Sequence, residues 1–492
     1  MDIPRTKLVC TIGPASVERV RELIDAGMSV ARINFSHGTP DEHRAAVHAV
    51  RAAAHHARRS VAVMVDLPGP KVRLGDLPNG EIELAAGQRL ELRAAAPPTD
   101  APVPTDAPVP TGEPAPTGEP APTGEPGPGA VTVNRSTLVE ELQPGDRVLL
   151  ADGAAELRVV EIAEGLIRTE VVRGGSVRSR SGVNVPVERL SGPALTPADE
   201  EALPRALELR ADLIAQSFVR SAADVRALRE RLPADGPLVV AKIETRAGVD
   251  AFDEVAAASD GVMIARGDLG VDIAYEEVPL VQKDLLSRAA SAGRFTIVAT
   301  QMLESMTDSS RPTRAEASDV ANAVLDGADG VMLSAETAIG RFPLEAARAM
   351  IAICRMTEEK APPPAVRSTR RPHDGPSAIV HGAAAMAHDY PAVSAVWCFT
   401  RSGRTAELLS VLRPRVAVLA FTVSAIVARR LAVRWGVLPM VIPAGRTGEP
   451  LIERMRNAAQ ARQVVAGSSQ VLLLTTSAQA GGVNRLELHE VE

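Results

Sequence analysis

Two short apolar runs in this chain end in residues that could hold a metal ion and a phosphate. Lys242 stands near the end of the run at 239–243, and Glu244 follows two positions later. If the run is a strand, both side chains point to the same face, because side chains alternate along a strand. Asp268 follows the second run, 262–265, in a turn flanked by glycines. A lysine and two carboxylates at the ends of adjacent buried strands could bind a divalent cation and a phosphate, so we expect the active site here.

The elements that must position these residues alternate between strand and helix. Apolar runs that predict strands recur at 8–12, 30–35, 61–65, 213–218, 238–243, 261–264, 295–299 and 330–333, and a stretch of helical periodicity follows each. Eight successive βα units form a closed parallel barrel. We therefore predict an α/β fold: a (β/α)8 TIM barrel that carries an inserted all-β lid domain and a C-terminal α/β domain.

The βα pattern is interrupted after the third strand. Residues 68–186 have the pattern of short β-strands separated by turns, which predicts the inserted lid, while residues 1–67 and 187–358 form the barrel. Residues 359–492 begin with a proline-rich linker and continue as a smaller, mostly parallel α/β domain. Within the lid, the segment 96–129 repeats every six residues around proline and is expected to be extended. It is either a docking tract or, as we favour, a tolerated loop expansion.

Composition argues against several classes of function. With 492 residues the chain is long enough for two or three domains. A formal charge of -7 and an aromatic content of 2% argue against a nucleic-acid binder. The chain has no run of about 18 apolar residues and no signal-peptide pattern, so we expect a cytoplasmic protein that does not enter a membrane. The three cysteines are too widely spaced for a disulfide framework or a zinc site.

In such barrels the active site lies at the carboxyl ends of the strands. Polar residues gather there in this chain, namely Arg32, Asn34, Ser36, Asp66, Arg73, Ser217, Lys242, Glu244, Arg266, Asp268, Thr300 and Ser334, with Gly267 between Arg266 and Asp268. Taken singly, each has a structural alternative: Glu244 could be solvated or paired with an arginine, and Asp66 could cap a turn. However, a buried lysine needs partners, and the convergence of several strands on one rim favours a site.

At these same positions the chain resembles pyruvate kinase. The motifs that carry the resemblance are TKLVCTIGP (6–14), ARINFSHG (31–38), AKIE (241–244), MIARGDLG (263–270), ATQMLESM (299–306), RPTRAE (311–316) and SDVANAVLDG (318–327). The resemblance covers nearly the whole chain. It implies Mg²⁺-dependent transfer of a phosphoryl group from phosphoenolpyruvate to ADP, giving pyruvate and ATP, the last step of glycolysis. It also implies that the inserted domain closes as a lid and that the C-terminal domain is regulatory.

The resemblance assigns roles residue by residue. Catalytic roles fall on Lys242, Thr300 and Arg32, and phosphoenolpyruvate would be bound by Arg32, Lys242, Gly267, Asp268 and Thr300. Glu244 and Asp268 would hold Mg²⁺ (or Mn²⁺). The positions that touch the nucleotide would be Asn34, Phe35, Ser36, His37 and Arg73.

A monovalent cation is a second expected cofactor in this family. Its positions correspond to Asn34, Ser36, Asp66 and Leu67. The stretch DLPGPK at 66–71 departs from the family's K⁺-binding pattern, because it carries leucine and lysine at the variable places. This pair resembles the K⁺-independent branch. We therefore hypothesise that the ammonium group of Lys71 replaces K⁺.

A possible effector site lies in the C-terminal domain. The loop between a strand and a helix carries Thr400, Arg401, Ser402, Gly403, Arg404 and Thr405. Hydroxyls, backbone N–H groups and arginines at a helix start suit a phosphate, although an ordinary turn is the alternative. The resemblance implies a phosphorylated allosteric effector and a homotetramer. Two other functions stay open: an inactive copy that senses a metabolite, and a different phosphoenolpyruvate-using barrel enzyme.

Overall fold

In the computed structural model, eight parallel strands close into a barrel in the order β1-β17-β16-β15-β14-β13-β3-β2. The strands are β1 (Lys7–Thr11), β2 (Met28–Asn34), β3 (Ala62–Asp66), β13 (Leu213–Gln216), β14 (Leu238–Ile243), β15 (Gly261–Ala265), β16 (Phe295–Ala299) and β17 (Gly330–Leu333). Strands that are consecutive among these eight pair with each other, and β1 pairs with β17 to close the ring. The predicted (β/α)8 barrel is confirmed.

The structure describes residues 4–94, 130–151, 153–186, 189–361, 372, 374–445, 449–464, 469–475 and 483–491. They fall into two compact units: Lys71–Gly192 form one, and Met1–Pro70 with Pro193–Glu492 form the other. The repeat at 96–129 lies outside the described residues. The finer domain boundaries given above stay predictions.

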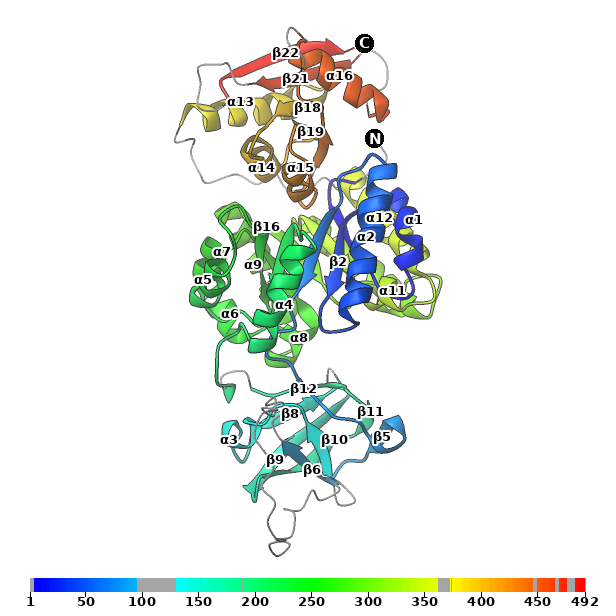
Figure 1. Cartoon of the computed structure of the whole chain (residues 1–492), viewed down its shortest axis with the longest axis vertical. Coiled ribbons are helices and arrows are strands. Elements are labelled where there is room, and N and C mark those ends of the chain that lie inside the picture. The colour runs from blue at the N-terminus through cyan, green and yellow to red at the C-terminus, as the bar shows by residue number, and fades with distance from the viewer. Residues whose placement is uncertain are drawn as a thin grey trace, which may run out of the picture. The chain divides into compact units, whose positions relative to one another are not determined.

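Helices surround the barrel strands, as Figure 1 shows for α2, α4 and α9. They are α1 (Val20–Ala26), α2 (Pro40–His56), α4 (Pro197–Glu208), α5 (Ala222–Glu230), α6 (Arg246–Asp250), α7 (Phe252–Ala258), α8 (Arg266–Asp272), α9 (Val278–Ala292), α10 (Arg314–Leu325), α11 (Ala335–Ala338) and α12 (Pro343–Lys360), with single 3-10 turns at Val17–Arg19 and Glu304–Thr307. Four of them begin with a capping box, in which the N-cap residue and the residue three positions later bond each other's backbone N–H; the N-caps are Thr39, Thr196, Ser221 and Thr313. No helix in the described part of the chain combines the length and apolar character needed to cross a membrane.

Apolar side chains fill the inside of the barrel as a cluster separate from the layer under the helices. The inner cluster includes Val9, Met64, Val240, Met263, Phe295, Ile297 and Met332. Ala432 and Val433, which follow helix α15 (Ala425–Leu431) of the C-terminal region, belong to the same cluster and are fully or almost fully buried. The barrel interior is therefore completed by residues from outside the eight βα units.

The unit Lys71–Gly192 is built almost entirely of β-strands, as predicted for the inserted domain. A seven-stranded sheet has the order β4-β12-β8-β9-β10-β6-β7, and β11 pairs with β5. The elements are β4 (Val72–Arg73), a 3-10 turn (Pro78–Gly80), β5 (Glu81–Leu84), β6 (Arg89–Ala94), β7 (Ala130–Val133), α3 (Leu138–Glu141), β8 (Arg147–Leu150), β9 (Ala155–Ala163), β10 (Leu166–Arg173), β11 (Gly175–Arg178) and β12 (Gly182–Asn184). It has its own apolar core, which contains Leu92, Val148, Leu157 and Ile167.

The C-terminal region is a five-stranded sheet in the order β20-β19-β18-β21-β22. Its elements are α13 (Gly375–Asp389), β18 (Val393–Phe399), α14 (Arg404–Val411), β19 (Ala417–Thr422), α15, β20 (Val437–Val441), α16 (Leu451–Ala461), β21 (Ser469–Thr475) and β22 (Arg485–Val491). Helices α13, α14 and α15 pack on one face of the sheet and α16 on the other. The mostly parallel sheet was predicted, but the last strand, β22, pairs antiparallel and was missed.

Ion pairs join this region to the barrel. Asp212, just before β13, is 2% exposed. Its Oδ1 accepts a hydrogen bond from Nε of Arg429 on α15 (2.8 Å), and its Oδ2 accepts from Arg51 Nη2 (2.8 Å) and the backbone N–H of Val63 (2.9 Å). One buried carboxylate thus holds two arginines that are far apart in the sequence.

We expect Asp212→Ala to lower the apparent melting temperature by several degrees. Removing one partner of a buried ionic cluster leaves cations without a counter-charge and costs roughly 3 kcal/mol or more. Differential scanning calorimetry measures the shift. The control is Asp284→Ala, which removes an exposed partner of Arg288 and is expected to change stability by less than about 0.5 kcal/mol. Equal shifts in the two variants would contradict this role for Asp212.

Candidate active site

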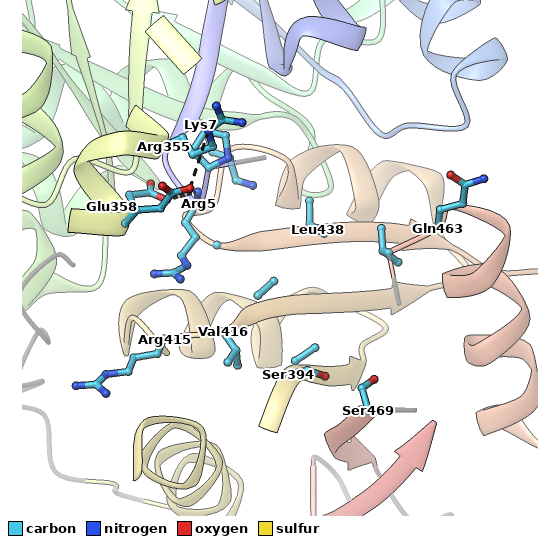
Figure 2. Close-up of a pocket in the computed structure, with 16 residues that line it drawn as sticks. Arg5, Lys7, Arg355, Glu358, Ser394, Arg415, Val416, Leu438, Gln463 and Ser469 are labelled. Atoms are coloured by element: carbon cyan, nitrogen blue, oxygen red, sulfur yellow. Dashed lines mark hydrogen bonds and ion pairs between the residues drawn. The ribbon is translucent and has the colours of Figure 1, made fainter. Parts of the chain in front are cut away.

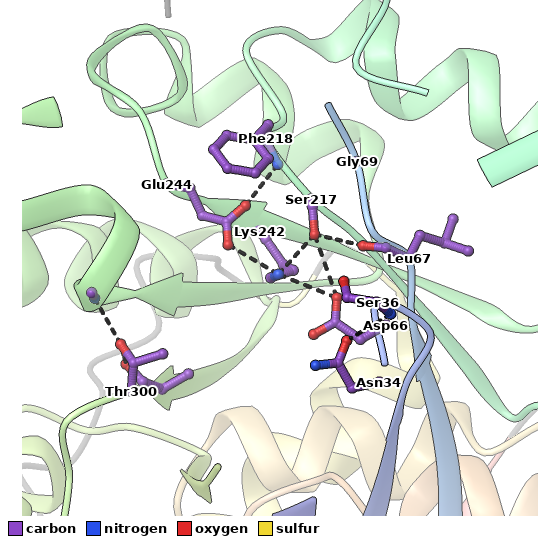
Figure 3. A network of polar contacts seen from close by, with 12 residues as sticks. Asn34, Ser36, Asp66, Leu67, Gly69, Ser217, Phe218, Lys242, Glu244 and Thr300 are labelled. Carbon is purple, nitrogen blue, oxygen red and sulfur yellow. Dashed lines mark hydrogen bonds and ion pairs between the residues drawn. The ribbon is translucent and has the colours of Figure 1, made fainter. Parts of the chain in front are cut away.

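Lys242 lies at the centre of a buried polar network at the carboxyl end of β14 (Figure 3). Its Nζ donates a hydrogen bond to Ser217 Oγ (2.7 Å) and forms ion pairs with Glu244 Oε1 (2.9 Å) and Asp66 Oδ1 (3.2 Å). The residue is only 8% exposed. The expectation that a buried lysine needs partners is met by two carboxylates from different strand ends.

The charge on Lys242 is stabilised by these neighbours. Burial alone would lower its pKa, but the carboxylates of Asp66 and Glu244 outweigh burial and hold the pKa above its ordinary value. The ammonium group is therefore permanently charged at neutral pH. A fixed positive charge in a site of low dielectric constant is suited to an anionic substrate.

Asp66, at the end of β3, connects Lys242 to Arg32, which lies on β2. Its Oδ2 accepts a hydrogen bond from Arg32 Nε (2.7 Å), and Arg32 Nη1 donates to Thr11 Oγ1 (3.0 Å). Burial would raise the pKa of Asp66, but the adjacent Lys242 and Arg32 bring it below the ordinary value. The carboxylate is thus ionised, and it holds both cations at one rim of the barrel.

Glu244 is buried, and the Asp268 carboxylate lies near enough to influence its pKa. Glu244 is 1% exposed, and its Oε2 accepts a hydrogen bond from the backbone N–H of Phe218 (2.7 Å). Its Oε1 is buried and accepts no hydrogen bond from the residues that the structure describes, although it faces Lys242. Burial raises the pKa of Glu244, and the nearby Asp268 carboxylate raises it further, against the lowering effect of Lys242. A cation between the two carboxylates would relieve this repulsion, so the residues present fit Mg²⁺.

A cation at Glu244 and Asp268 would need further ligands. In the described part of the chain, no group of three His, Cys, Asp or Glu side chains is arranged to hold a metal. Mg²⁺ usually takes one or two carboxylates and fills its other positions with water and substrate oxygens. The donor set therefore fits a cation that is shared with a substrate.

Thr300 lies opposite this network, directly after β16. Its Oγ1 accepts a hydrogen bond from the Gly267 N–H (2.7 Å) and donates to the Ala299 carbonyl (2.6 Å). Thr300 and Gln301 both have a positive φ, 69° and 55°, which is strained for residues with a Cβ. The sharp turn brings the threonine hydroxyl to the start of α8, whose formation after β15 was predicted.

Arg266 holds this strained turn in place. Its Nη2 donates to the carbonyls of Thr300 (2.9 Å) and Gln301 (3.1 Å), and Nη1 donates to Asp319 Oδ1 (2.8 Å). The residue is 9% exposed, so these bonds form in a largely water-free environment. Arg266 was expected only as one of several rim residues. The structure shows that it supports Thr300 through hydrogen bonds to the backbone of the turn.

The positions expected to contact a nucleotide or a monovalent cation fall into two groups. On the barrel, Asn34 Oδ1 accepts a hydrogen bond from the Ser36 N–H (3.1 Å). Phe35 stacks on His43, with the ring centroids 4.4 Å apart. The carbonyl oxygen of the buried Leu67 accepts a hydrogen bond from Ser217 Oγ (2.7 Å). His37 accepts a hydrogen bond from His43 at its carbonyl oxygen (2.7 Å).

Arg73 and Lys71 belong to the other compact unit. Arg73 lies on β4, where its backbone N–H donates to Asn134 Oδ1 (2.8 Å) and its Nη1 donates to the Arg180 carbonyl (3.2 Å). Lys71 comes directly before this strand. Their approach to the barrel residues therefore stays a prediction.

The predicted effector loop connects β18 to α14. Thr400 Oγ1 accepts a hydrogen bond from the Gly403 N–H (2.9 Å), and Gly403 has φ of 97°, which favours glycine. Arg404 is the first residue of α14. The loop has the geometry of a tight strand-to-helix turn, and binding of a phosphate there stays a prediction.

The sequence analysis did not identify two residues that contribute to the polar network around Lys242. Thr11 binds Arg32, and its place at the end of β1 was the available signal. Phe218 contributes only its backbone N–H, from a residue with φ of 54°, so no side-chain pattern could have indicated it.

A (β/α)8 barrel with a charged lysine, an arginine and buried carboxylates at the carboxyl ends of its strands defines an enzyme for anionic, phosphorylated substrates. A family model described as the barrel domain of pyruvate kinase matches residues 3–101 and 118–347, and one described as the alpha/beta domain of pyruvate kinase matches residues 377–489. The chain belongs to the pyruvate kinase family, whose members are phosphotransferases. The unmatched stretch 102–117 falls within the proline-rich repeat.

Curated relatives agree over nearly the whole chain. The pyruvate kinase of Sporosarcina psychrophila is 38% identical over 99% of this chain and 80% of its own length. That of Mycobacterium tuberculosis (strain ATCC 25618 / H37Rv) is 39% identical over 92% of this chain and 90% of its own. That of Agrobacterium vitis is 38% identical over 98% of both chains.

Proposed function

We propose that this protein transfers the phosphoryl group of phosphoenolpyruvate to ADP, giving pyruvate and ATP. The observation that carries the proposal is the buried cluster in which Lys242 and Arg32 share the carboxylate of Asp66 at the rim of the barrel. Two fixed cations at one rim suit a substrate that carries a phosphate and a carboxylate.

In the proposed reaction, the bond between phosphorus and the enol oxygen of phosphoenolpyruvate breaks as a bond to a β-phosphate oxygen of ADP forms. The enolate that remains takes up a proton at carbon and becomes pyruvate. Arg32 would bind the phosphate, and Lys242 would stabilise the negative charge on the moving phosphoryl group and on the enolate oxygen. The hydroxyl of Thr300 would lie at the enolate face and assist binding or protonation.

The substrate carboxylate would bind the backbone N–H groups of Gly267 and Asp268 at the start of α8. The Gly267 N–H is already bonded to Thr300 Oγ1, so substrate binding would require these two groups to exchange partners. Glu244 and Asp268 would hold Mg²⁺ or Mn²⁺, which when bound neutralises phosphate charge. Asn34, Phe35, Ser36, His37 and Arg73 would contact the nucleotide.

We expect activity to persist when K⁺ is absent. The proposed monovalent-cation positions are Asn34, Ser36, Asp66 and Leu67. The ammonium group of Lys71 would supply the positive charge in place of K⁺. Turnover is compared in K⁺-free buffer and in buffer with K⁺, with tetramethylammonium to keep the ionic strength equal. In the Lys71→Met variant, activity should depend on K⁺. A wild-type enzyme that requires K⁺ would contradict the assignment.

We also expect Arg266→Met to lower kcat about 10- to 100-fold, since a small displacement of Thr300 is enough to misalign the reacting groups. Steady-state kinetics with phosphoenolpyruvate separates kcat from KM. The kcat of Arg266→Lys, which keeps the charge but has only one nitrogen, should lie between the values of the wild type and of Arg266→Met. Thr300→Ser keeps the hydroxyl and serves as the milder control. An Arg266→Met enzyme with unchanged kcat would show that the turn holds without this arginine.

The function itself is tested by a coupled assay for pyruvate. The purified protein, with phosphoenolpyruvate, ADP and Mg²⁺, should form pyruvate and ATP in equal amounts. Binding of phosphoenolpyruvate without pyruvate formation would favour an inactive metabolite sensor. Consumption of phosphoenolpyruvate without ADP would favour another phosphoenolpyruvate-using enzyme.

Regulation and assembly of the protein are proposed as well. The loop from Thr400 to Thr405 would bind a phosphorylated effector through its hydroxyls, its backbone N–H groups and its two arginines. Family resemblance alone supports a homotetramer and a cytoplasmic location.

A further inference from the structure

A pocket of about 450 Å³ lies where the barrel meets the C-terminal sheet (Figure 2). The barrel contributes the start of β1 and the end of α12. The C-terminal region contributes the amino ends of β18, β19, β20 and β21. Its volume is within the range of sites for small molecules. No residue of the proposed active site lines it.

The lining has more positive than negative charge. It carries Arg5, Lys7, Arg355 and Arg415 against two carboxylates, Glu358 and Glu359. Burial, with Arg59 nearby, lowers the pKa of Lys7 to about 7, against the raising effects of Glu358 and Asp329, and its Nζ donates to the Val437 carbonyl (2.7 Å). The surplus of positive charge holds even without Lys7, because three arginines face two carboxylates.

The acidic residues leave this surplus largely intact. Glu358 accepts hydrogen bonds from the backbone N–H groups of Arg5 (2.8 Å) and Thr6 (2.7 Å) and from Thr6 Oγ1 (2.7 Å), so its charge is used to hold the start of β1. Glu359 is exposed and lies 4.0 Å from Arg355, a weak contact. Within the described part of the chain, the guanidinium groups of Arg5 and Arg415 form no ion pair. Figure 2 shows Arg5 extending from the barrel into the pocket, and Arg415 at the edge of the pocket with its side chain directed outward.

The rest of the pocket suits the body of a small metabolite. Ala395, Val416, Leu438 and Val464 provide apolar surface. Ser469 also lines the pocket, and its Oγ is buried without a hydrogen-bond partner among the described residues. A buried hydroxyl that lacks a partner is unfavourable and would gain from a polar ligand group.

We propose that this pocket binds a small phosphomonoester, with the phosphate on Arg5 and Arg415. Guanidinium groups bind phosphate oxygens in pairs of parallel hydrogen bonds, and a dianion matches a surplus of positive charge. The site differs from the predicted effector loop, because that loop follows the carboxyl end of β18 whereas the pocket lies at the amino ends of the strands. A ligand here contacts the barrel and the C-terminal region together. The inference does not depend on the proposed reaction.

Isothermal titration calorimetry on the full-length protein tests the site, with glycerol phosphate as probe and glycerol as the uncharged control. Three variants are compared: Arg5→Ala with Arg415→Ala in the pocket, Arg401→Ala with Arg404→Ala in the effector loop, and Arg32→Gln in the active site. We expect the pocket pair to weaken binding at least tenfold, while a site of wild-type affinity persists in the other two. Since Arg415 is exposed, Arg415→Glu alone provides a second variant that should fold normally and lose the same binding.

Three results would overturn the proposal. The first is that the wild-type protein does not bind glycerol phosphate at millimolar concentration. The second is that both pocket variants bind it as the wild type does. The third is an equal loss of affinity in all three sets of variants, which would indicate non-specific attraction.

Discussion

Lys242→Met is expected to lower kcat by roughly 10³-fold or more, because fixed cations supply most of the stabilisation in phosphoryl transfer. The structure adds a second expected result. Lys242 separates the buried carboxylates of Asp66 and Glu244, so its removal leaves two negative charges without their partner. Breaking such a cluster costs about 3–5 kcal/mol, and the apparent melting temperature should fall as well.

Steady-state kinetics, with circular dichroism and calorimetry on the same samples, separates the two effects. Lys242→Arg keeps the charge and should recover most of the stability, but little of the activity, because the planar guanidinium cannot occupy the position of Nζ. A folded Lys242→Met enzyme with kcat within tenfold of the wild type would remove Lys242 from its proposed role.

Glu244→Gln is expected to raise the Mg²⁺ concentration needed for half-maximal activity by at least about tenfold, and to lower kcat at saturating Mg²⁺. The amide has nearly the same shape as the carboxylate, and its oxygen can still accept the Phe218 N–H, so the fold should be retained. The change removes only the charge that would bind the cation together with Asp268.

A Mg²⁺ titration of activity measures this effect. The matched control is Glu277→Gln, the same chemical change at a half-exposed residue that pairs with Arg246. It should leave the Mg²⁺ requirement as it is in the wild type. If Glu244→Gln responds to Mg²⁺ as the control does, the cation is bound elsewhere.

Much of the barrel could be predicted because its strands are short, apolar and separated by helices with clear starting signals. Thr196 and Asp199 stand three positions apart before an apolar stretch, a spacing typical of a capping box, and the structure contains one there. By contrast, β22 was missed. Its sequence, RLELHEV, is highly charged and largely exposed, since it lies at the edge of the sheet and has weak apolar alternation.

The candidate site was predicted in part. Residues at strand ends converge because parallel strands end at one rim, so Arg32, Asp66, Lys242 and Glu244 could be grouped from the sequence. Which atoms touch could not be predicted, because it depends on side-chain conformation and on backbone turns such as the one at Thr300. Asp66 was expected as a cation ligand, and the structure shows it bonded to Arg32 and Lys242. The link from Arg266 to Thr300 joins two strand ends and leaves no pattern in either segment.

The presence of Ala432 and Val433 in the inner cluster of the barrel has a consequence for synthesis. During translation all eight barrel strands leave the ribosome about a hundred residues before these two side chains do, since β17 ends at Leu333. The nascent barrel can pair its strands, but part of its interior stays in contact with water until the C-terminal region follows. Final packing of the first-made domain thus waits for the last-made one, and chains that stop before residue 432 should be recognised by chaperones and proteases as incomplete.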